Sequence, residues 1–176
     1  MSRRFRTEPS VTRHRLDLDD DRPLVLLTMG GVVWDYEFLD LLERHQEMVF
    51  VVPGGAERWT GRDNLVLLPH HTPLYHPDLV AAADVVVGKL GYSTLAEAYR
   101  AGVPLVFVRR PHFPESPILA EFAQRHLPCH EISAEEFREG TWLEELPRLL
   151  DADRPPAVAE NGADEIAGHL DSLLRV

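Results

Sequence analysis

Cysteine, long apolar runs and basic residues are all scarce in this chain of 176 residues, and each scarcity excludes a class of protein. A single cysteine, Cys129, excludes an internal disulfide framework and a thiolate metal cluster. No run of about 18 apolar residues occurs, and the arginine-rich amino terminus lacks the following apolar stretch that a secretory signal requires. We therefore expect no stable membrane insertion and a cytoplasmic location.

The formal net charge of −11 argues against binding to nucleic acid or to anionic lipid, since both require a basic surface. The charge is unevenly distributed along the chain. Residues 131–171 contain twelve acidic residues against three arginines, whereas residues 84–110 contain four basic residues against two acidic ones. A locally basic middle in an acidic protein is suited to a small anionic ligand.

Several catalytic motifs are also missing. The sequence has neither the Gly-x-x-x-x-Gly-Lys-Ser/Thr loop of ATPases nor the three-glycine fingerprint of NAD-dependent dehydrogenases. No Gly-x-Ser-x-Gly segment provides an anchor for Ser/His/Asp catalysis. His70, His71 and His76 suggest a metal, but adjacent histidines in a strand point to opposite faces, and no carboxylate lies at helical ligand spacing. We predict no metal site and no cofactor.

The chain divides into two parts. Residues 1–22 are rich in Arg and Asp and show no apolar periodicity, so we predict a flexible arm or linker there. Residues 23–176 have the length and hydrophobic content for one sizeable core, with the fold beginning near Leu24.

Short apolar runs then alternate with helix-like stretches. Five runs predict strands that are buried on both faces, at residues 24–28, 48–52, 65–68, 84–87 and 104–108. The alternation indicates right-handed βαβ crossovers, so the predicted fold class is α/β, with a Rossmann-like, doubly wound and mostly parallel sheet. The chain is helical in pattern from Ser133, and a final helix is expected to begin near Asn161.

The strongest candidate site follows the fourth predicted strand, where Gly88 and Gly91 flank Lys89 ahead of a helix. The amino terminus of a helix presents unpaired N–H groups and the positive end of its dipole, both of which favour phosphate. Gly91 would let the backbone approach the phosphates, Lys89 would add a charge, and the hydroxyl of Ser93 or Thr94 would add a donor. This loop is predicted to bind a diphosphate.

Two neighbouring features have alternative interpretations. Thr94 and Glu97 have the spacing of a capping box, so Glu97 serves equally well to cap the helix or to contact a ligand. Gly30 and Gly31 follow the first predicted strand and could face the same crevice. Taken alone, this pair of glycines is better explained as a tight turn.

A third group of polar residues follows the fifth predicted strand. An arginine at Arg109 or Arg110 could hold a phosphate, and Glu115 could accept hydrogen bonds from sugar hydroxyls. For Arg109, pairing with the acidic carboxyl-terminal region is an equally good interpretation.

Residues 83–98, followed by Ala-Gly-Val-Pro-Leu at 101–105, resemble the donor-binding half of GT-B glycosyltransferases. The bacterial N-acetylglucosaminyltransferase that completes the lipid-linked peptidoglycan precursor is one member of this group. A closer likeness is to the glycosyltransferase-like domain of plant arabinokinases, in segments that occur in the same order at 88–92, 107–110, 113–117 and 161–163. The resemblance runs from about Leu24 to the carboxyl terminus.

This resemblance implies roles for individual residues. In the transferases, the residues that match Gly91, Ser93 and Thr94 cradle the diphosphate, and the residue that matches Glu97 binds ribose hydroxyls. Backbone corresponding to residues 69–74 reads the base. The acidic residue that matches Glu115 contacts the donor sugar, whose identity stays open because Ser116 replaces a longer amide or acid.

GT-B enzymes use an amino-terminal domain to bind the acceptor and usually to supply the catalytic base, and this chain has no counterpart of that domain. The resemblance therefore implies a domain that binds a nucleotide-sugar, UDP-linked by preference, and that works with an acceptor-binding domain or partner chain. No catalytic residue is expected in this chain. The alternatives are a non-catalytic nucleotide-sugar-binding or regulatory module, and a nucleotide-binding oligomerisation domain with an interface formed by the carboxyl-terminal helices.

Overall fold

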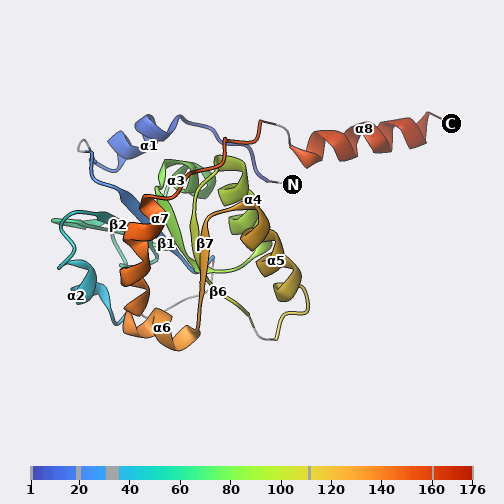
Figure 1. Ribbon diagram of the computed structural model, residues 1–176. Coiled ribbons are helices and arrows are strands. Elements are labelled where there is room, and N and C mark those ends of the chain that lie inside the picture. The colour runs from blue at the N-terminus through green and yellow to red at the C-terminus, as the bar shows by residue number, and fades with distance from the viewer. Residues whose placement is uncertain (1, 19–20, 31–35, 111, 160, 176) are drawn as a thin grey trace.

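The computed structural model describes residues 2–18, 21–30, 36–110, 112–159 and 161–175. A seven-stranded sheet forms its centre, in the order β3-β4-β2-β1-β5-β6-β7 (Figure 1). The strands are β1 (Leu24–Thr28), β2 (Val49–Pro53), β3 (Thr60–Arg62), β4 (Leu65–Leu68), β5 (Val85–Lys89), β6 (Leu105–Val108) and β7 (Cys129–Ile132). β3 pairs antiparallel with β4, and the other pairings are parallel.

Helices cover both faces of the sheet (Figure 1). One layer contains α1 (Pro9–Arg15), α3 (His76–Ala82), α4 (Tyr92–Ala101) and α5 (Ser116–His126). The opposite layer contains α2 (Leu39–Leu42), α6 (Ala134–Glu139), the 3₁₀ helix η1 (Thr141–Glu145) and α7 (Leu146–Leu150). The last helix, α8 (Gly162–Leu174), extends away from the body of the domain.

The strand β1 shows why the sheet is buried on both faces. Its side chains alternate, so that Leu24 and Leu26 pack under α3, α4 and α5, whereas Val25 and Leu27 pack in the opposite cluster. These four side chains are 0–1% exposed. The five predicted strands and the predicted Rossmann-like, mostly parallel α/β fold are confirmed.

Two strands escaped prediction because they lie at the edges of the sheet. β3 is Thr-Gly-Arg and β7 is Cys-His-Glu-Ile, so neither forms a continuous apolar run. An edge strand has a partner on one side only and tolerates polar side chains, which are among the devices that protect edges from further pairing.

The amino-terminal segment packs against the domain, which the prediction of a flexible arm did not anticipate. Helix α1 begins at Pro9, and Leu16 beyond it is 2% exposed within the core cluster under α3 to α5. Arg13 donates a hydrogen bond to Asp84, with 2.9 Å between Nη2 and Oδ2. The segment is therefore fixed by Leu16 and the partly buried Leu18 and by polar side-chain contacts, which do not produce a periodic apolar pattern.

The carboxyl-terminal third follows the predicted pattern. Phe137, Trp142 and Leu146 are 0–1% exposed in the core cluster that α6, η1 and α7 cover. Asn161 caps α8, because its side chain accepts a hydrogen bond from the Ala163 N–H at 3.2 Å. Among the described residues, none of the helices is both long enough and apolar enough to cross a bilayer.

The order of the strands determines where a ligand can bind. From β1 the chain builds outward through β2 and β4, and then continues on the other side of β1 through β5, β6 and β7. Ligands of open α/β sheets bind at such a reversal, beyond the carboxyl ends of the strands. Here that place lies between the end of β1 at Thr28 and the end of β5 at Lys89.

The glycine of β5 allows these two strands to approach closely. A Cβ atom added to Gly88 would lie 1.8 Å from the carbonyl oxygen of Thr28, whereas one added to Gly91 would have nothing within 4 Å. We predict that Gly88→Ala lowers the free energy of unfolding by about 3 kcal/mol or more, because backbone must move to relieve the clash.

The matched variant Gly91→Ala should change the free energy of unfolding by less than about 1 kcal/mol, because its added methyl group meets open space. Urea denaturation of both variants measures the two values. Equal stability for the two would contradict the close approach of β1 and β5.

Candidate functional site

Three of the predicted binding residues meet at the carboxyl ends of β1, β5 and β6. A Cβ atom built on Gly30, which follows β1, would lie 3.8 Å from the Nζ atom of Lys89, the last residue of β5. Arg110, which follows β6, is close enough for its charge to lower the pKa of Lys89. Gly31 lies outside the described residues. The strand order thus brings together groups that are 80 residues apart in the sequence.

Lys89 occupies an unfavourable environment for a cation. Burial, and after it the positive charge of Arg110, lower the pKa of Lys89 below its ordinary value of 10.5. In the described part of the chain, no carboxylate forms a salt bridge with Lys89 or Arg110. The Arg110 guanidinium lies 3.5 Å from the centre of the Phe113 ring. An anion bound between these two cations would offset their mutual repulsion and would favour the charged form of the partly buried Lys89.

The amino terminus of α4 is open to a ligand. Gly91 is the N-cap residue, in an extended conformation with φ −148° and ψ 156°, and no side chain caps the helix. The Leu95 N–H donates to the Gly91 carbonyl, so the preceding N–H groups of Tyr92, Ser93 and Thr94 lie outside the helical ladder. The predicted loop therefore presents N–H groups next to Lys89.

The structure contradicts the capping-box interpretation of Thr94 and Glu97. Because α4 begins at Tyr92, Thr94 lies in its first turn and Glu97 in its second, so neither is placed to cap the helix. The Glu97 side chain is instead 1% exposed, and it forms an ion pair with Arg3 and a hydrogen bond with His76. Its Oε1 atom lies 2.8 Å from Arg3, and its Oε2 atom lies 3.2 Å from Nδ1 of His76.

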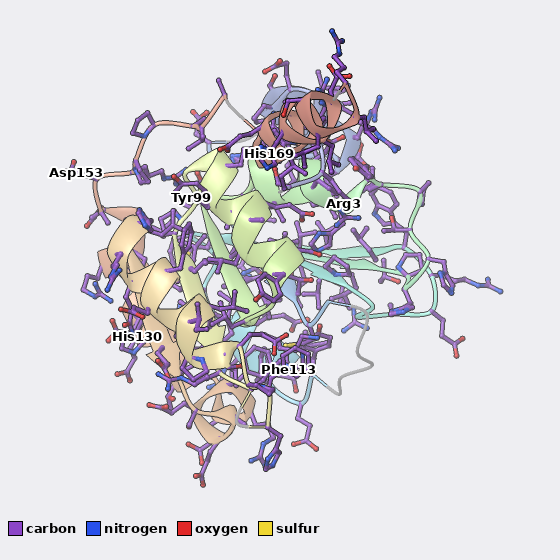
Figure 2. All side chains as sticks on the ribbon, turned by 90° about the vertical axis from the view of Figure 1, so that its right-hand side faces the viewer. Arg3, Tyr99, Phe113, His130, Asp153 and His169 are labelled. Carbon is purple, nitrogen blue, oxygen red and sulfur yellow. The ribbon has the colours of Figure 1, made fainter. Side chains whose placement is uncertain are left out.

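This buried network extends to the end of β1, because Nε2 of His76 lies 2.9 Å from the hydroxyl of Thr28. Figure 2 shows Arg3 beside the helical layer that contains α4. Arg3 and His76, the partners of Glu97, and Thr28, the partner of His76, were not predicted from the sequence. The position of Thr28 at the end of a predicted strand was a usable signal, but Arg3 lies 94 residues from Glu97 and gave none.

Arg109 and the histidine pair His70–His71 also follow strands of the sheet. Arg109 pairs with Glu131 of β7, with 2.7 Å between Nη2 and Oε2, so the ion-pair interpretation of this arginine is confirmed. His70 and His71 follow β4 in a turn, and their rings meet edge to face with centroids 5.2 Å apart. These two rings are therefore not on opposite faces of a strand, as predicted, because both residues lie beyond the end of β4. Within the described chain, no three potential metal ligands form a group.

The loop after β6 contains the remaining candidate. Glu115 is half-buried and occupies the N-cap position of α5, with no side-chain capping bond. Ser116 beside it is 1% exposed, and in the described structure its hydroxyl has no hydrogen-bond partner. Buried hydroxyls are normally satisfied, so this orphan group is suited to a polar ligand or a water molecule.

Comparison with known proteins supports this fold. No protein-family model matches the chain. The chain is 30% identical over 170 residues to the L-arabinokinase of Arabidopsis thaliana, an alignment that covers 96% of this chain and 16% of the arabinokinase. The likeness to arabinokinases is therefore confirmed, over a small part of that protein.

Three solved structures share the fold. The glycosyltransferase of kitacinnamycin has a TM-score of 0.60 and 18% identity, over 74% of this chain and 35% of that one. The UDP-GlcNAc 2-epimerase of Neisseria meningitidis, bound to UDP-GlcNAc, has a TM-score of 0.60 and 15% identity, over 95% of this chain and 50% of the epimerase. The glycosyltransferase VinC in complex with dTDP has a TM-score of 0.53 and 22% identity, over 78% and 35%.

These likenesses confirm the fold as a GT-B half-domain. They do not separate transferases from epimerases, because a fold hosts several activities. The chain spans half or less of each solved structure and 16% of the arabinokinase.

The effect of Arg110 on Lys89 can be measured directly, because Lys89 is the only lysine in the sequence. We predict that Arg110→Met raises the pKa of Lys89 part of the way toward 10.5, while burial retains the rest of the shift. A titration of the single ¹³Cε-lysine signal by NMR measures this pKa. The control Arg109→Met removes an arginine paired with Glu131 and should leave the signal in place. Equal shifts in both variants would disprove the specific repulsion of Lys89 by Arg110.

Proposed function

We propose that this domain binds a nucleotide-sugar, UDP-linked by preference, as the donor-binding half of a glycosyltransferase. The observation that supports it most is the meeting of Lys89, Arg110 and the uncapped amino terminus of α4 at the reversal of strand order. Lys89 and Arg110 have no carboxylate partner among the described residues, and together with the N–H groups of α4 they match the charge and hydrogen-bonding needs of a diphosphate.

In this proposal each predicted residue has a defined task. N–H groups at Ser93 and Thr94 bind the diphosphate, with the backbone at Gly91 and Gly30 able to approach it. Lys89 and Arg110 neutralise its charge, and stabilise it further as it departs during transfer. Glu97 contacts the ribose, residues 69–74 contact the base, and Glu115 contacts the sugar.

The proposal also includes an acceptor-binding domain or partner chain, and α8 supports it. Ile166, Leu170 and Leu173 form a stripe along one side of α8 and are 47–60% exposed, and no described residue of this helix is buried. A groove of about 320 Å³ begins at the start of α8 and runs between α4 and α5, where Ile118 is 66% exposed. Adjoining apolar surfaces of this kind are typical of an interface.

A non-catalytic nucleotide-sugar-binding or regulatory module is the second candidate. The match to an arabinokinase favours it, because there a related segment forms part of a protein named for a different reaction. Restoring an acceptor-binding half separates the two candidates. Transfer of the sugar by the restored protein supports the transferase, and binding without turnover supports the module.

The donor site is tested by calorimetric titration with UDP and UDP-sugars. We expect measurable binding to the wild-type protein and at least a tenfold weaker affinity, about 1.4 kcal/mol, for Lys89→Met, because a charge-assisted contact to phosphate is lost. Binding should also protect the Lys89 amine from acylation. Its lowered pKa leaves more of the amine neutral at alkaline pH, so affinity should fall as the pH rises through that pKa.

Arg109→Met is the matched control, since it removes a positive charge from the same loop that is already paired with Glu131. Its affinity for UDP should stay within about twofold of the wild type. No heat of binding at millimolar UDP in a folded sample would overturn the proposed function.

A further inference from the structure

The carboxylate of Glu97, which the proposed function assigns to the ribose, is closed off by the protein itself. Its side chain is 1% exposed, although it belongs to the helix that begins at the donor site. The Nε and Nη2 atoms of Arg3 each lie 2.8 Å from its Oε1 atom. On the other oxygen, Nδ1 of His76 lies 3.2 Å from Oε2.

Arg3 and a ribose compete for the same acceptor. The Nε–H of Arg3 donates to Oε1, and its Nη2 atom lies 2.8 Å from the same oxygen, so the guanidinium occupies the side of the carboxylate that His76 leaves free. The ribose hydroxyls also donate to a carboxylate. We infer that Arg3 and the nucleoside of the donor bind Glu97 in alternation, so that the amino-terminal segment is an internal competitor of the nucleotide. This inference rests on the proposed function.

The segment is anchored in a way that lets residues 2–5 move alone. The Arg6 N–H donates to Oδ1 of Asp78 at 2.7 Å, and the Thr7 hydroxyl donates to Oδ2 of the same carboxylate at 3.0 Å. Asp78 is 4% exposed, and Leu16 lies further along in the core. From residue 6 onward the segment therefore stays attached whether or not Arg3 is bound to Glu97.

Before residue 6, the arginine side chains of the segment are more than half exposed. The Arg3 side chain is 51% exposed, and its carbonyl accepts a hydrogen bond from Arg100 at 3.3 Å. Arg4 pairs with Asp164, where both side chains are more than 60% exposed. Ser2 exchanges hydrogen bonds with the Asn161 side chain. The exposed Arg4–Asp164 pair contributes little to stability, so it adds little to the cost of displacing the segment.

The exchange leaves the buried carboxylate satisfied in both states. With the segment bound, Arg3 and His76 supply its partners, and with the nucleotide bound, the ribose replaces Arg3 while His76 stays. The His76 ring is held from its other side by Thr28, at 2.9 Å. The carboxylate of Glu97 therefore has partners in both states, so the exchange avoids the high free-energy cost of an unpaired buried charge.

Titration of UDP into the wild type, Arg3→Ala and Arg4→Ala tests the competition. Arg3→Ala should bind about tenfold more tightly, as expected if the competing segment closes the site in about nine molecules of ten. Arg4→Ala is the matched control, because it removes the same charge from the adjacent residue without touching Glu97. Its affinity should stay within about twofold of the wild type, because the exposed Arg4–Asp164 pair contributes little to holding the segment.

A second measurement uses the wild-type protein, so it does not depend on how a variant folds. Saturating UDP should accelerate tryptic cleavage after Arg3 and Arg4. Inorganic phosphate at the same concentration, without UDP, should leave the rate of cleavage unchanged. Equal UDP affinities for all three proteins, weaker binding by Arg3→Ala, or unchanged cleavage would overturn the competition and leave the donor site standing. Absence of UDP binding in all three would overturn the proposed function and this inference together.

Discussion

The close approach of β5 to β1 is the constraint on which the candidate site depends. Gly88 lies opposite Thr28 in the parallel register, with its hydrogen atom against the Thr28 carbonyl, where a side chain has no room. This pairing places the ends of the two strands side by side at the point where the strand order reverses. Gly30 and Lys89 then share one place, although each belongs to a different loop.

A second consequence concerns electrostatics. The domain is acidic overall, yet the carboxyl edge of its sheet gathers Lys89 and Arg110 without a carboxylate partner among the described residues. Arg109, the neighbour of Arg110, is neutralised by Glu131 of β7. One arginine of the pair is thus used for structure, and the other faces the lysine. Net charge says nothing of this local arrangement, which follows from the order of β5, β6 and β7.

The buried carboxylate of Glu97 joins parts of the chain that no local pattern connects. It draws together the amino-terminal segment through Arg3, the start of α3 through His76 and, through that histidine, the end of β1. A charge this deeply buried requires partners, and the fold supplies two of them, Arg3 and His76, from separate parts of the chain. The amino-terminal segment therefore belongs to the site as well as to the fold.

The sequence by itself determined the architecture and the position of the main loop. Five continuous apolar runs specified strands that are buried on both faces, as in a doubly wound sheet. Gly88 and Gly91 marked the loop at the end of one of these strands. Periodicity and glycine placement are local properties, so they can be seen without a structure.

Only the tertiary structure decided the partners of individual side chains. Because α4 starts at Tyr92, Glu97 lies in the second turn of the helix and is buried, and it does not cap the helix. The packing of residues 2–18 against the domain places Arg3 in contact with it. The edge strands β3 and β7 and the pairing of Arg109 were decided in the same way. Such contacts join residues far apart in the chain, and their geometry exists only once the sheet has assembled.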